Sequence, residues 1–396
     1  MAERPSTPYR PSAAERAERR AFEALLALPK SARKRAAGRP HVVDGGALDP
    51  DIATGLKVLG RVGGKELDER TIDDARTALA AESWMFAGEP ADVASVEQVT
   101  IDGAAHGADG DIPAFLYRPN PSPVTVVGKH ADAARTPGTA RPCVVYFHGG
   151  GWVLGSAQTH DAVARALCAD GEVIVLNVDY RRAPEHVFPA AVDDAVAAFR
   201  WAHANAERLG IDPERIAVAG DSAGGNLSAV VAQETTRHGG PKPALQMLFV
   251  PVTDLTLPRS DSYERFSSGY FLTRANMDWY EATYLTGSPT LGGSSDVDID
   301  ALRADPRVSP LRATDLDALV AAGLPPAYVA VAGFDPLRDE GIAYARMLER
   351  AGVATTLRVH TDAVHPFINI LATDLGRRCM AEAVGAMRTA LGVDPA

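Results

Sequence analysis

The sequence is short of cysteine, of long apolar runs and of basic charge, and each shortage argues against a class of protein. Its three cysteines, Cys143, Cys168 and Cys379, form no C-x-x-C pair, which argues against a disulfide framework and structural zinc and indicates reduced thiols in the cytoplasm. No apolar run reaches the roughly 18–20 residues that span a bilayer, so we expect no stable membrane insertion. A net charge of −11 argues against the binding of nucleic acid.

The N-terminal segment is basic although the chain as a whole is acidic. Residues 1–40 carry ten Lys and Arg against four Glu, which predicts a basic, partly disordered tail with a short helix near residues 13–28. A basic arm that touches a membrane or an acidic partner is the alternative. Residues 19–28 faintly resemble an export signal, but the apolar part is short and contains Glu23, so we expect the protein in the cytoplasm.

Helical patterns give way to strand patterns near residue 96. In residues 41–95, leucine and aromatic residues recur at helical spacing, which predicts helices that pack over another part of the molecule. From residue 96 to residue 396, short apolar runs alternate with helical segments. The expected strands are 96–102, 112–118, 143–147, 173–178, 216–219, 245–252, 327–332 and 355–359, and the expected helices are 161–169, 190–208, 223–236, 339–351 and a last one from 368. This alternation predicts βαβ units and a mostly parallel central sheet flanked by helices.

Two segments interrupt this alternation. Residues 119–142 are rich in Pro, Ala, Gly and Thr, which predicts a long surface loop inserted into the core. Residues 254–324 hold many aromatic side chains between two expected strands. A long aromatic excursion of this kind favours a lid or cap insertion.

A G-x-S-x-G motif marks the candidate nucleophile. The run Gly220–Gly224 follows an apolar stretch and opens a helical segment, which is the context that this motif requires in a hydrolase. A sharp turn from strand to helix strains the serine backbone and projects its oxygen above the sheet. Glycines two residues before and after the serine avoid a collision of side chains. We therefore expect Ser222 to be the nucleophile.

A run of three glycines follows the apolar stretch at residues 143–147. Within His148–Trp152, consecutive glycines let backbone N–H groups converge on one point. An H-G-G-G run after an early strand is typical of the oxyanion loop of lipases and esterases. No lysine follows the glycines, as a phosphate-binding P-loop would require. We interpret His148 as a residue that orders this loop, because the triad histidine of such hydrolases comes last in the chain.

A serine nucleophile needs a base, and in this class the order along the chain is Ser, then Asp or Glu, then His. Three histidines follow Ser222. Among them His365 lies in a loop before the last helical segment and is preferred as the base over His360, which ends a strand. Asp335 follows an apolar run closely and is preferred as the acid over Asp254, which would follow the preceding strand.

Together these motifs resemble those of the bacterial hormone-sensitive-lipase-like esterases, family IV of the α/β-hydrolase fold. The resemblance runs from about residue 113 to residue 367. Its blocks are H-G-G-G-W at His148–Trp152, a Y-R-x-A-P-E segment within Asp179–Glu185, G-D-S-A-G-G-N at Gly220–Asn226 and D-P-L-R-D-E at Asp335–Glu340. One departure is Pro366, because the family usually has H-G-F where this chain has H-P-F. Proline fixes φ and removes an N–H donor, so it could alter the loop that carries His365.

The resemblance implies an architecture and a set of site residues. The architecture is an α/β-hydrolase fold with a helical cap, built from the helices of residues 41–95 and the insertion at about 254–324. The triad is Ser222 as nucleophile, Asp335 as acid and His365 as base. The oxyanion donors are the backbone amides of Gly150, Gly151 and Ala223.

These roles imply a carboxylic ester hydrolase that works through an acyl-enzyme and needs no metal or organic cofactor. We expect its partner to be a small-molecule ester with a short- to medium-chain acyl group, and a homodimer is left open. Trp152, Phe271 and Phe367 are expected to line the substrate pocket. The alternatives are a catalytically weak or inactive ligand-binding protein on the same scaffold, or an amidase or acyltransferase.

Overall fold

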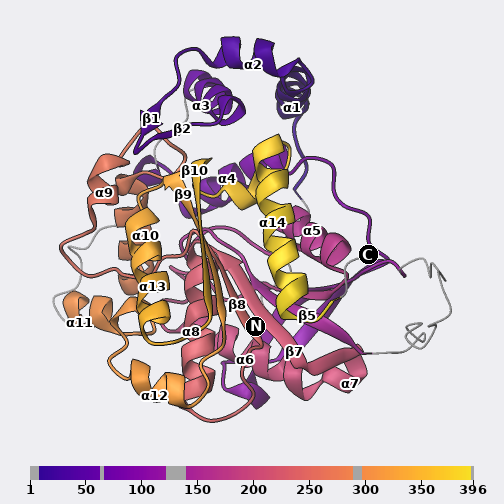
Figure 1. The fold of residues 1–396 in the computed structure, drawn as a ribbon, viewed down its shortest axis with the longest axis vertical. Helices are drawn as coiled ribbons and strands as arrows, with labels where there is room; N and C mark the ends of the chain where they lie inside the picture. Colours follow the sequence, from indigo (N-terminus) through magenta and orange to yellow (C-terminus); the bar gives the residue numbers. More distant parts are fainter. Residues whose placement is uncertain (1–8, 63–66, 122–139, 289–296, 394–396) are drawn as a thin grey trace.

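An eight-stranded sheet forms the centre of the molecule (Figure 1). The computed structural model describes residues 9–62, 67–121, 140–288 and 297–393. The strands lie in the order β10-β9-β8-β7-β5-β6-β4-β3. Their bounds are β3 (Ser95–Asp102), β4 (Asp111–Arg118), β5 (Arg141–Phe147), β6 (Ile174–Val178), β7 (Ile211–Asp221), β8 (Leu245–Phe249), β9 (Ala327–Phe334) and β10 (Thr355–Val364). Pairing is parallel from β10 to β6, whereas β4 pairs antiparallel with both β3 and β6. The predicted, mostly parallel sheet is confirmed.

Helices cover both faces of this sheet, as Figure 1 shows. They are α5 (Asp161–Gly171) and α14 (Asp374–Ala390) on one face, and α6 (Ala190–Ala204), α7 (Ala206–Leu209), α8 (Ala223–Arg237) and α13 (Arg338–Arg350) on the other. Side chains alternate along β5 because successive residues of a strand point to opposite faces. Val144 and Tyr146 join the apolar core shared with α5 and α14, whereas Val145 and Phe147 join the core shared with α6 and α8.

Some elements begin or end elsewhere than the apolar pattern predicts. Strand β7 begins at Ile211, several residues before the predicted run at 216, and β10 extends to Val364, so that His365 follows it directly. Helix α14 begins at Asp374 rather than near 368, because the side chain of Thr373 caps its first turn. The intervening residues include the short 3-10 helix η4 (Phe367–Asn369).

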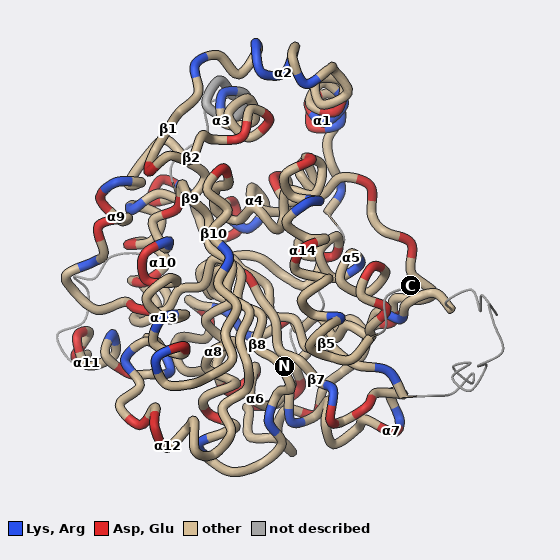
Figure 2. Tube along the Cα trace, viewed as in Figure 1, with Lys and Arg blue, Asp and Glu red and all other residues tan. Residues whose placement is uncertain are grey.

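The N-terminal region forms helices and a small two-stranded sheet at one end of the molecule (Figure 1). Its elements are α1 (Ala13–Leu26), α2 (Lys30–Ala37), β1 (Val42–Val43), β2 (Gly46–Ala47), α3 (Pro50–Val62), η1 (Leu67–Glu69) and α4 (Ile72–Phe86). Helix α2 carries Lys and Arg but no Asp or Glu, whereas α1 carries charges of both signs, as Figure 2 shows along the chain.

Helix α1 lies where a short helix near residues 13–28 was expected, and it packs against the rest of the molecule. Helix α1 begins with a capping box formed by Ser12 and Glu15, and its Phe22 is buried. The Phe22 ring meets the Phe86 ring edge to face, with centroids 5.3 Å apart. Because the partner of Phe22 is distant in the sequence, local sequence patterns do not predict this contact. Residues 1–8 lie outside the described residues.

A second group of short helices follows β8. It comprises α9 (Asp261–Arg265), α10 (Arg274–Thr286), α11 (Ile299–Ala304), η3 (Pro310–Arg312) and α12 (Leu316–Ala321). Phe271, just before α10, contacts Phe86 of α4 edge to face with centroids 5.5 Å apart, so the two helical regions touch. The expected insertion at residues 119–142 lies mostly outside the described residues. In the described part of the chain, no helix is long and apolar enough to cross a membrane.

Candidate active site

A cavity of about 250 Å³ brings together residues from distant parts of the sequence. Gly150, Gly151, Ser222 and His365 line it from the side of the sheet. Side chains of α4 and α10, Tyr280 among them, line the opposite side. The cavity therefore lies between the carboxyl ends of β5 and β7 and the two helical regions, where an α/β sheet usually binds its ligand.

Ser222 occupies the sharp turn between β7 and α8. Its backbone has φ 56° and ψ −119°, a strained conformation that a non-glycine residue adopts only when its surroundings impose it. The turn requires the flanking glycines, because a Cβ on Gly220 would lie 2.4 Å from the carbonyl carbon of Gly224. A Cβ on Gly224 would lie 1.9 Å from the carbonyl oxygen of Phe147. The motif thus has the backbone geometry expected of a nucleophile elbow.

The glycine loop after β5 presents two unused amides to the cavity. Gly150 and Gly151 have φ values of 115° and 59°, in a region that favours glycine. A Cβ on Gly151 would lie 2.2 Å from the ring of Tyr280. Among the described contacts, the Gly149 amide donates to Asp221 Oδ1, whereas the amides of Gly150 and Gly151 donate to no acceptor. Donors left free in this way suit an anion-binding hole.

Asp335 and His365 meet at the neighbouring ends of β9 and β10. His365 Nδ1 lies 3.0 Å from Asp335 Oδ2, and the acid is fully buried. The other carboxylate oxygen, Asp335 Oδ1, accepts a hydrogen bond from the Leu337 amide at 2.9 Å. The contact forms with Pro366 in place, so the proline does not separate the imidazole from the acid. Because Nδ1 faces the acid, Nε2 is the nitrogen that remains for proton transfer.

Ser222 and His365 share the cavity without being hydrogen-bonded to each other. Within the described residues, the one hydrogen bond of the His365 side chain is the bond to Asp335. Bonds between a nucleophile and its base are often long in an unliganded hydrolase and shorten when substrate binds. The structure therefore brings the two groups to one site but leaves the final approach to the complex with substrate.

The structure places the alternative acid and base elsewhere. Asp254 pairs with Arg312, with Nε 3.1 Å from Asp254 Oδ1, and it does not line the cavity. His360 is buried against the ring of Phe367, with centroids 4.8 Å apart. Burial lowers the pKa of His360. Neither group therefore lines the cavity that contains Ser222.

Comparisons with known proteins agree with this geometry. A family model described as the α/β-hydrolase fold matches residues 144–369. The carboxylic ester hydrolase LipN of Mycobacterium tuberculosis is 43% identical over 343 residues, which cover 84% of this chain and 80% of that protein. The ethyl acetate hydrolase of Pseudomonas putida is 36% identical over 332 residues, which cover 82% and 93%. The chain belongs to the hormone-sensitive-lipase-like esterases of the α/β-hydrolase fold.

Solved structures of esterases resemble most of this chain. An ester hydrolase from the metagenome of Lake Arreo, complexed with a derivative of bipyridine phosphonate, is 37% identical with a TM-score of 0.74 and covers 87% of this chain and 100% of its own. A hyperthermophilic esterase from Pyrobaculum calidifontis is 34% identical with a TM-score of 0.73 and covers 86% and 98%. These relatives support carboxylic ester hydrolase activity and therefore an enzyme rather than a binding protein.

Asp221, the residue before Ser222, is the centre of a buried polar network in this esterase. Tyr146 Oη donates to Asp221 Oδ1 at 2.6 Å, and the Gly149 amide donates to the same oxygen at 3.2 Å. Asn369 Nδ2 donates to Oδ2 at 3.0 Å, and His160 Nε2 lies 3.3 Å from Oδ2. Burial acts to raise the pKa of Asp221, but the charge of His160 and these hydrogen bonds hold that pKa well below its usual range. Asp221 thus stays ionised and joins the glycine loop to the segment after His365.

The sequence reasoning missed His160 and Asn369 as parts of the site. Both line the cavity, yet His160 begins α5 and Asn369 lies in η4. A clue was present in the motif itself, because an Asp before the nucleophile at the end of a buried strand needs polar partners. No local pattern identifies those partners, since they come from segments far apart in the chain.

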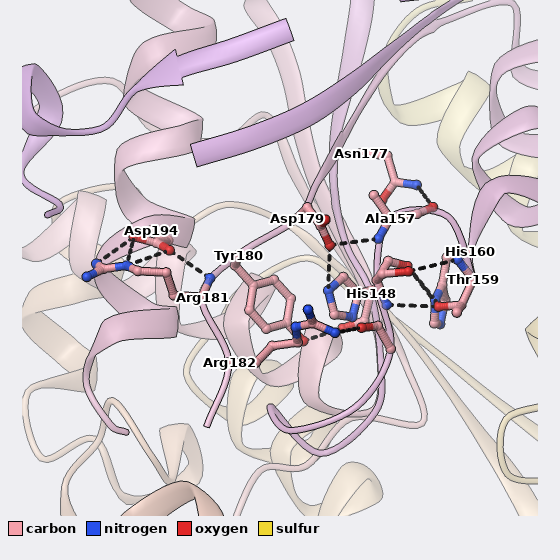
Figure 3. A network of polar contacts seen from close by, with 12 residues as sticks. His148, Ala157, Thr159, His160, Asn177, Asp179, Tyr180, Arg181, Arg182 and Asp194 are labelled. Atoms are coloured by element: carbon pink, nitrogen blue, oxygen red, sulfur yellow. Dashed lines mark hydrogen bonds and ion pairs between the residues drawn. The ribbon is translucent and has the colours of Figure 1, made fainter. Parts of the chain in front are cut away.

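His148 lies at the start of the glycine loop, which it was expected to order (Figure 3). Its Nδ1 donates to the Gly149 carbonyl at 2.8 Å, because a carbonyl can only accept. Its ring stacks on Tyr180 with centroids 4.2 Å apart, and Tyr180 Oη donates to the His148 carbonyl at 2.7 Å. Burial and the nearby His160 lower the pKa of His148 well below its usual value. A neutral, stacked imidazole fits a structural role in the loop.

The Y-R-x-A-P-E segment connects the cap helices to the core. Arg76 of α4 donates to both carboxylate oxygens of Glu185 at 2.7 Å and also to the carbonyls of Val153 and Ala183 at 3.0 Å. Val153 belongs to the turn that follows the glycine loop. A single guanidinium of α4 thus holds the backbone beside the glycine loop.

Of the three aromatic residues expected in the pocket, the structure puts only Phe271 in its lining. Trp152 is fully buried and stacks on Tyr284 with centroids 4.3 Å apart. Phe367 is buried beneath His360. Both rings follow a site residue in the sequence but point into the core, where aromatic side chains bury most surface. The expectation for Trp152 and Phe367 was therefore wrong.

Proposed function

We propose that this esterase hydrolyses carboxylic esters through an acyl-enzyme, with Ser222 as nucleophile, His365 as base and Asp335 as the acid that orients the base. The observation that carries the proposal is the 3.0 Å contact between Asp335 Oδ2 and His365 Nδ1. Because this contact engages Nδ1, the other imidazole nitrogen, Nε2, is free to transfer a proton. His365 and Ser222 line the same cavity.

The first half of the proposed reaction forms the acyl-enzyme. As Ser222 Oγ bonds to the ester carbonyl carbon, His365 Nε2 accepts the hydroxyl proton and then gives it to the departing alcohol. Asp335 stabilises the imidazolium that exists between these two transfers. In the second half, His365 accepts a proton from water as the water attacks the acyl group, and Ser222 leaves with that proton.

The oxyanion is proposed to accept hydrogen bonds from the backbone amides of Gly150, Gly151 and Ala223. The first two are free donors in the cavity wall. Ala223 is the first residue of α8, where the positive end of the helix dipole favours negative charge. Loss of one such donor typically costs about 10²–10³ in turnover.

The cavity volume favours small esters. About 250 Å³ lies just below the roughly 300–1,000 Å³ typical of ligand pockets, which agrees with short- to medium-chain acyl groups. The relative from Pseudomonas putida is named for the hydrolysis of ethyl acetate, and a similarly small ester is the first substrate to try. A homodimer remains a prediction, which sedimentation analysis tests.

A fluorophosphonate probe combined with p-nitrophenyl esters of increasing chain length tests the proposal. Because the nucleophile alone reacts covalently, Ser222→Ala should lose the label and at least about 10⁴-fold in kcat. Ser228→Ala is the matched control, since that hydroxyl donates to the Gly224 carbonyl within α8 and should leave labelling intact. Retained turnover by Ser222→Ala would reject the mechanism, and equal turnover of p-nitroanilides would contradict the preference for esters.

A further inference from the structure

One face of α4 lines the cavity on the side opposite the sheet, and this helix face carries a carboxylate. The residues of α4 that line the cavity are Ala75, Ala78, Leu79, Glu82, Ser83 and Phe86. Their spacing of three and four residues identifies a single helical face. Four of them are apolar and one is a small hydroxyl residue, so Glu82 is the only charged side chain on that face.

Glu82 is an exposed residue that lines the cavity. The protein atoms around its carboxylate raise its pKa by desolvation. Among the described residues, it makes no hydrogen bond or ion pair. The charge of Arg70, which also lines the cavity, acts on it in the opposite direction. A carboxylate placed in this way has unused acceptor capacity that faces the substrate space.

Glu82 is also close to the chemical centre. Its charge acts on Tyr280, whose ring would touch any Cβ placed on Gly151. At one end of the same helical face Ala75 packs near Leu154, and at the other end Phe86 meets Phe271. Along the cavity-lining face of α4, Glu82 therefore lies between the apolar residues Ala75 and Phe86. Through Tyr280 it is close to the proposed oxyanion loop.

We propose that Glu82 selects esters that carry a hydrogen-bond donor, as a hydroxyl or an ammonium group, in the part of the substrate that lies against α4. The inference rests on the proposed ester hydrolysis and names the substrate class for it. A purely aliphatic ester would remove water from the carboxylate without replacing its hydrogen bonds, which disfavours binding. A substrate donor would satisfy the same oxygen atoms in a partly dehydrated space, where such bonds are stronger.

Two matched substrate series test this selectivity, since either the acyl or the alcohol part could face α4. One series is the acetate esters of pentanol and of its 5-hydroxy, 5-ammonio and 5-trimethylammonio derivatives. The other is the p-nitrophenyl esters of octanoic acid and of its 8-hydroxy and 8-trimethylammonio derivatives. We measure kcat/KM relative to the unsubstituted ester of each series. The trimethylammonio group has charge but no N–H donor, so it separates attraction of charge from hydrogen bonding.

Two substitutions assign the selectivity to Glu82, and one controls for charge. Glu82→Leu should remove the preference for donor-bearing esters, a change of roughly tenfold in the ratio, as expected for one hydrogen bond to a charged group. Glu82→Gln should retain part of the hydroxyl preference and lose the ammonium preference. Asp73→Asn removes an exposed charge from the same helix outside the cavity lining and should change neither ratio.

The outcomes separate this inference from the proposed function. No turnover of any ester by the wild-type protein would reject the proposed function itself. Turnover with equal kcat/KM for donor-bearing and aliphatic esters in both series would overturn the role of Glu82 alone. A preference that persists in Glu82→Leu, or a preference for carboxylate-bearing esters through Arg70, would overturn it as well.

Discussion

The two sides of the cavity are built by different physical means. On the sheet side, a single carboxylate, that of Asp221, accepts hydrogen bonds from β5, from the glycine loop and from η4. On the cap side, α4 contacts its neighbours through aromatic edges, through Arg76, and through Arg19, which donates to the Trp84 carbonyl. Polar networks fix geometry closely, whereas apolar surfaces tolerate exchange of similar volumes. The comparison suggests that the sheet side determines whether an ester reacts, and the cap side determines which ester enters.

The sharpest test of the sheet side is the acid. Asp335→Asn should lower kcat by about 10⁴-fold, because an amide no longer holds His365 in the tautomer that can accept a proton. Asp254→Asn is the matched control, since that carboxylate pairs with Arg312 outside the cavity. Steady-state kinetics with one p-nitrophenyl ester compares the two variants. A larger loss in Asp254→Asn would reassign the acid.

A smaller effect should come from the network behind the nucleophile. Asp221→Asn should lower kcat by roughly 10²-fold, the scale that a misplacement of about 1 Å can cost. Asparagine keeps one acceptor oxygen where Asp221 has two, so it can no longer accept from both the glycine loop and η4. Asp194→Asn is the control: its carboxylate is equally buried but pairs with Arg181.

Both substitutions remove a buried carboxylate that accepts several hydrogen bonds, and each should lower the free energy of unfolding by about 1–3 kcal/mol or more. Denaturant unfolding and kcat are therefore measured together on Asp221→Asn and Asp194→Asn. Equal losses of kcat in the two variants would show that Asp221 acts through general stability and not through the position of the loop.

The cap side should be more tolerant. Arg76→Met keeps the aliphatic length but removes the bonds to Glu185 and Val153, so kcat/KM should fall by less than about tenfold, mostly through KM, as expected when substrate binding rather than chemistry is weakened. Arg208→Met, a surface arginine bonded to Asn205, is the control. A fall in kcat as large as that of Asp221→Asn would remove the distinction between the two sides.

The smallest effect on activity is expected from Glu340, whose replacement should change stability instead. Glu340 of α13 accepts hydrogen bonds from the Thr253 and Asp254 amides, and burial raises its pKa to about 8. Since this value exceeds the unfolded value of about 4.3, the folded protein retains a proton that the unfolded chain releases between those pH values. The contribution to stability is fully present below pH ~4.3 and is lost as the pH rises toward 8, by up to about 1.4 kcal/mol per pH unit.

The variant Glu340→Gln mimics the protonated side chain and should remove this slope. Its free energy of unfolding, measured relative to that of wild type, should therefore rise between pH 5 and pH 8. Glu349→Gln on the same helix, which pairs with Arg346, serves as the control. Parallel pH profiles for wild type and Glu340→Gln would show that the buried group does not titrate in this range.

The sequence predicted the sheet side far better than the cap side. Buried strands are recognisable as short apolar runs, and the glycines around Ser222 are required by backbone contacts within a few residues. His160 and Asn369 could not be predicted, because their common partner Asp221 is reached only after the sheet has assembled. Phe22 was likewise missed, since its partner Phe86 lies in another helix. Local patterns reveal the backbone that strands and turns dictate, but not the partners that tertiary packing supplies.

The close approach of Tyr280 to Gly151 means that the glycine motif cannot be moved to another protein by its sequence alone. The ring leaves no space for even one carbon atom on Gly151, so a residue of α10 helps to shape a loop that belongs to the sheet. Inserting the sequence H-G-G-G into another protein would supply three flexible glycines but not the Tyr280 ring that packs against them here. A designed hydrolase that borrows this loop should therefore borrow its overhanging tyrosine as well.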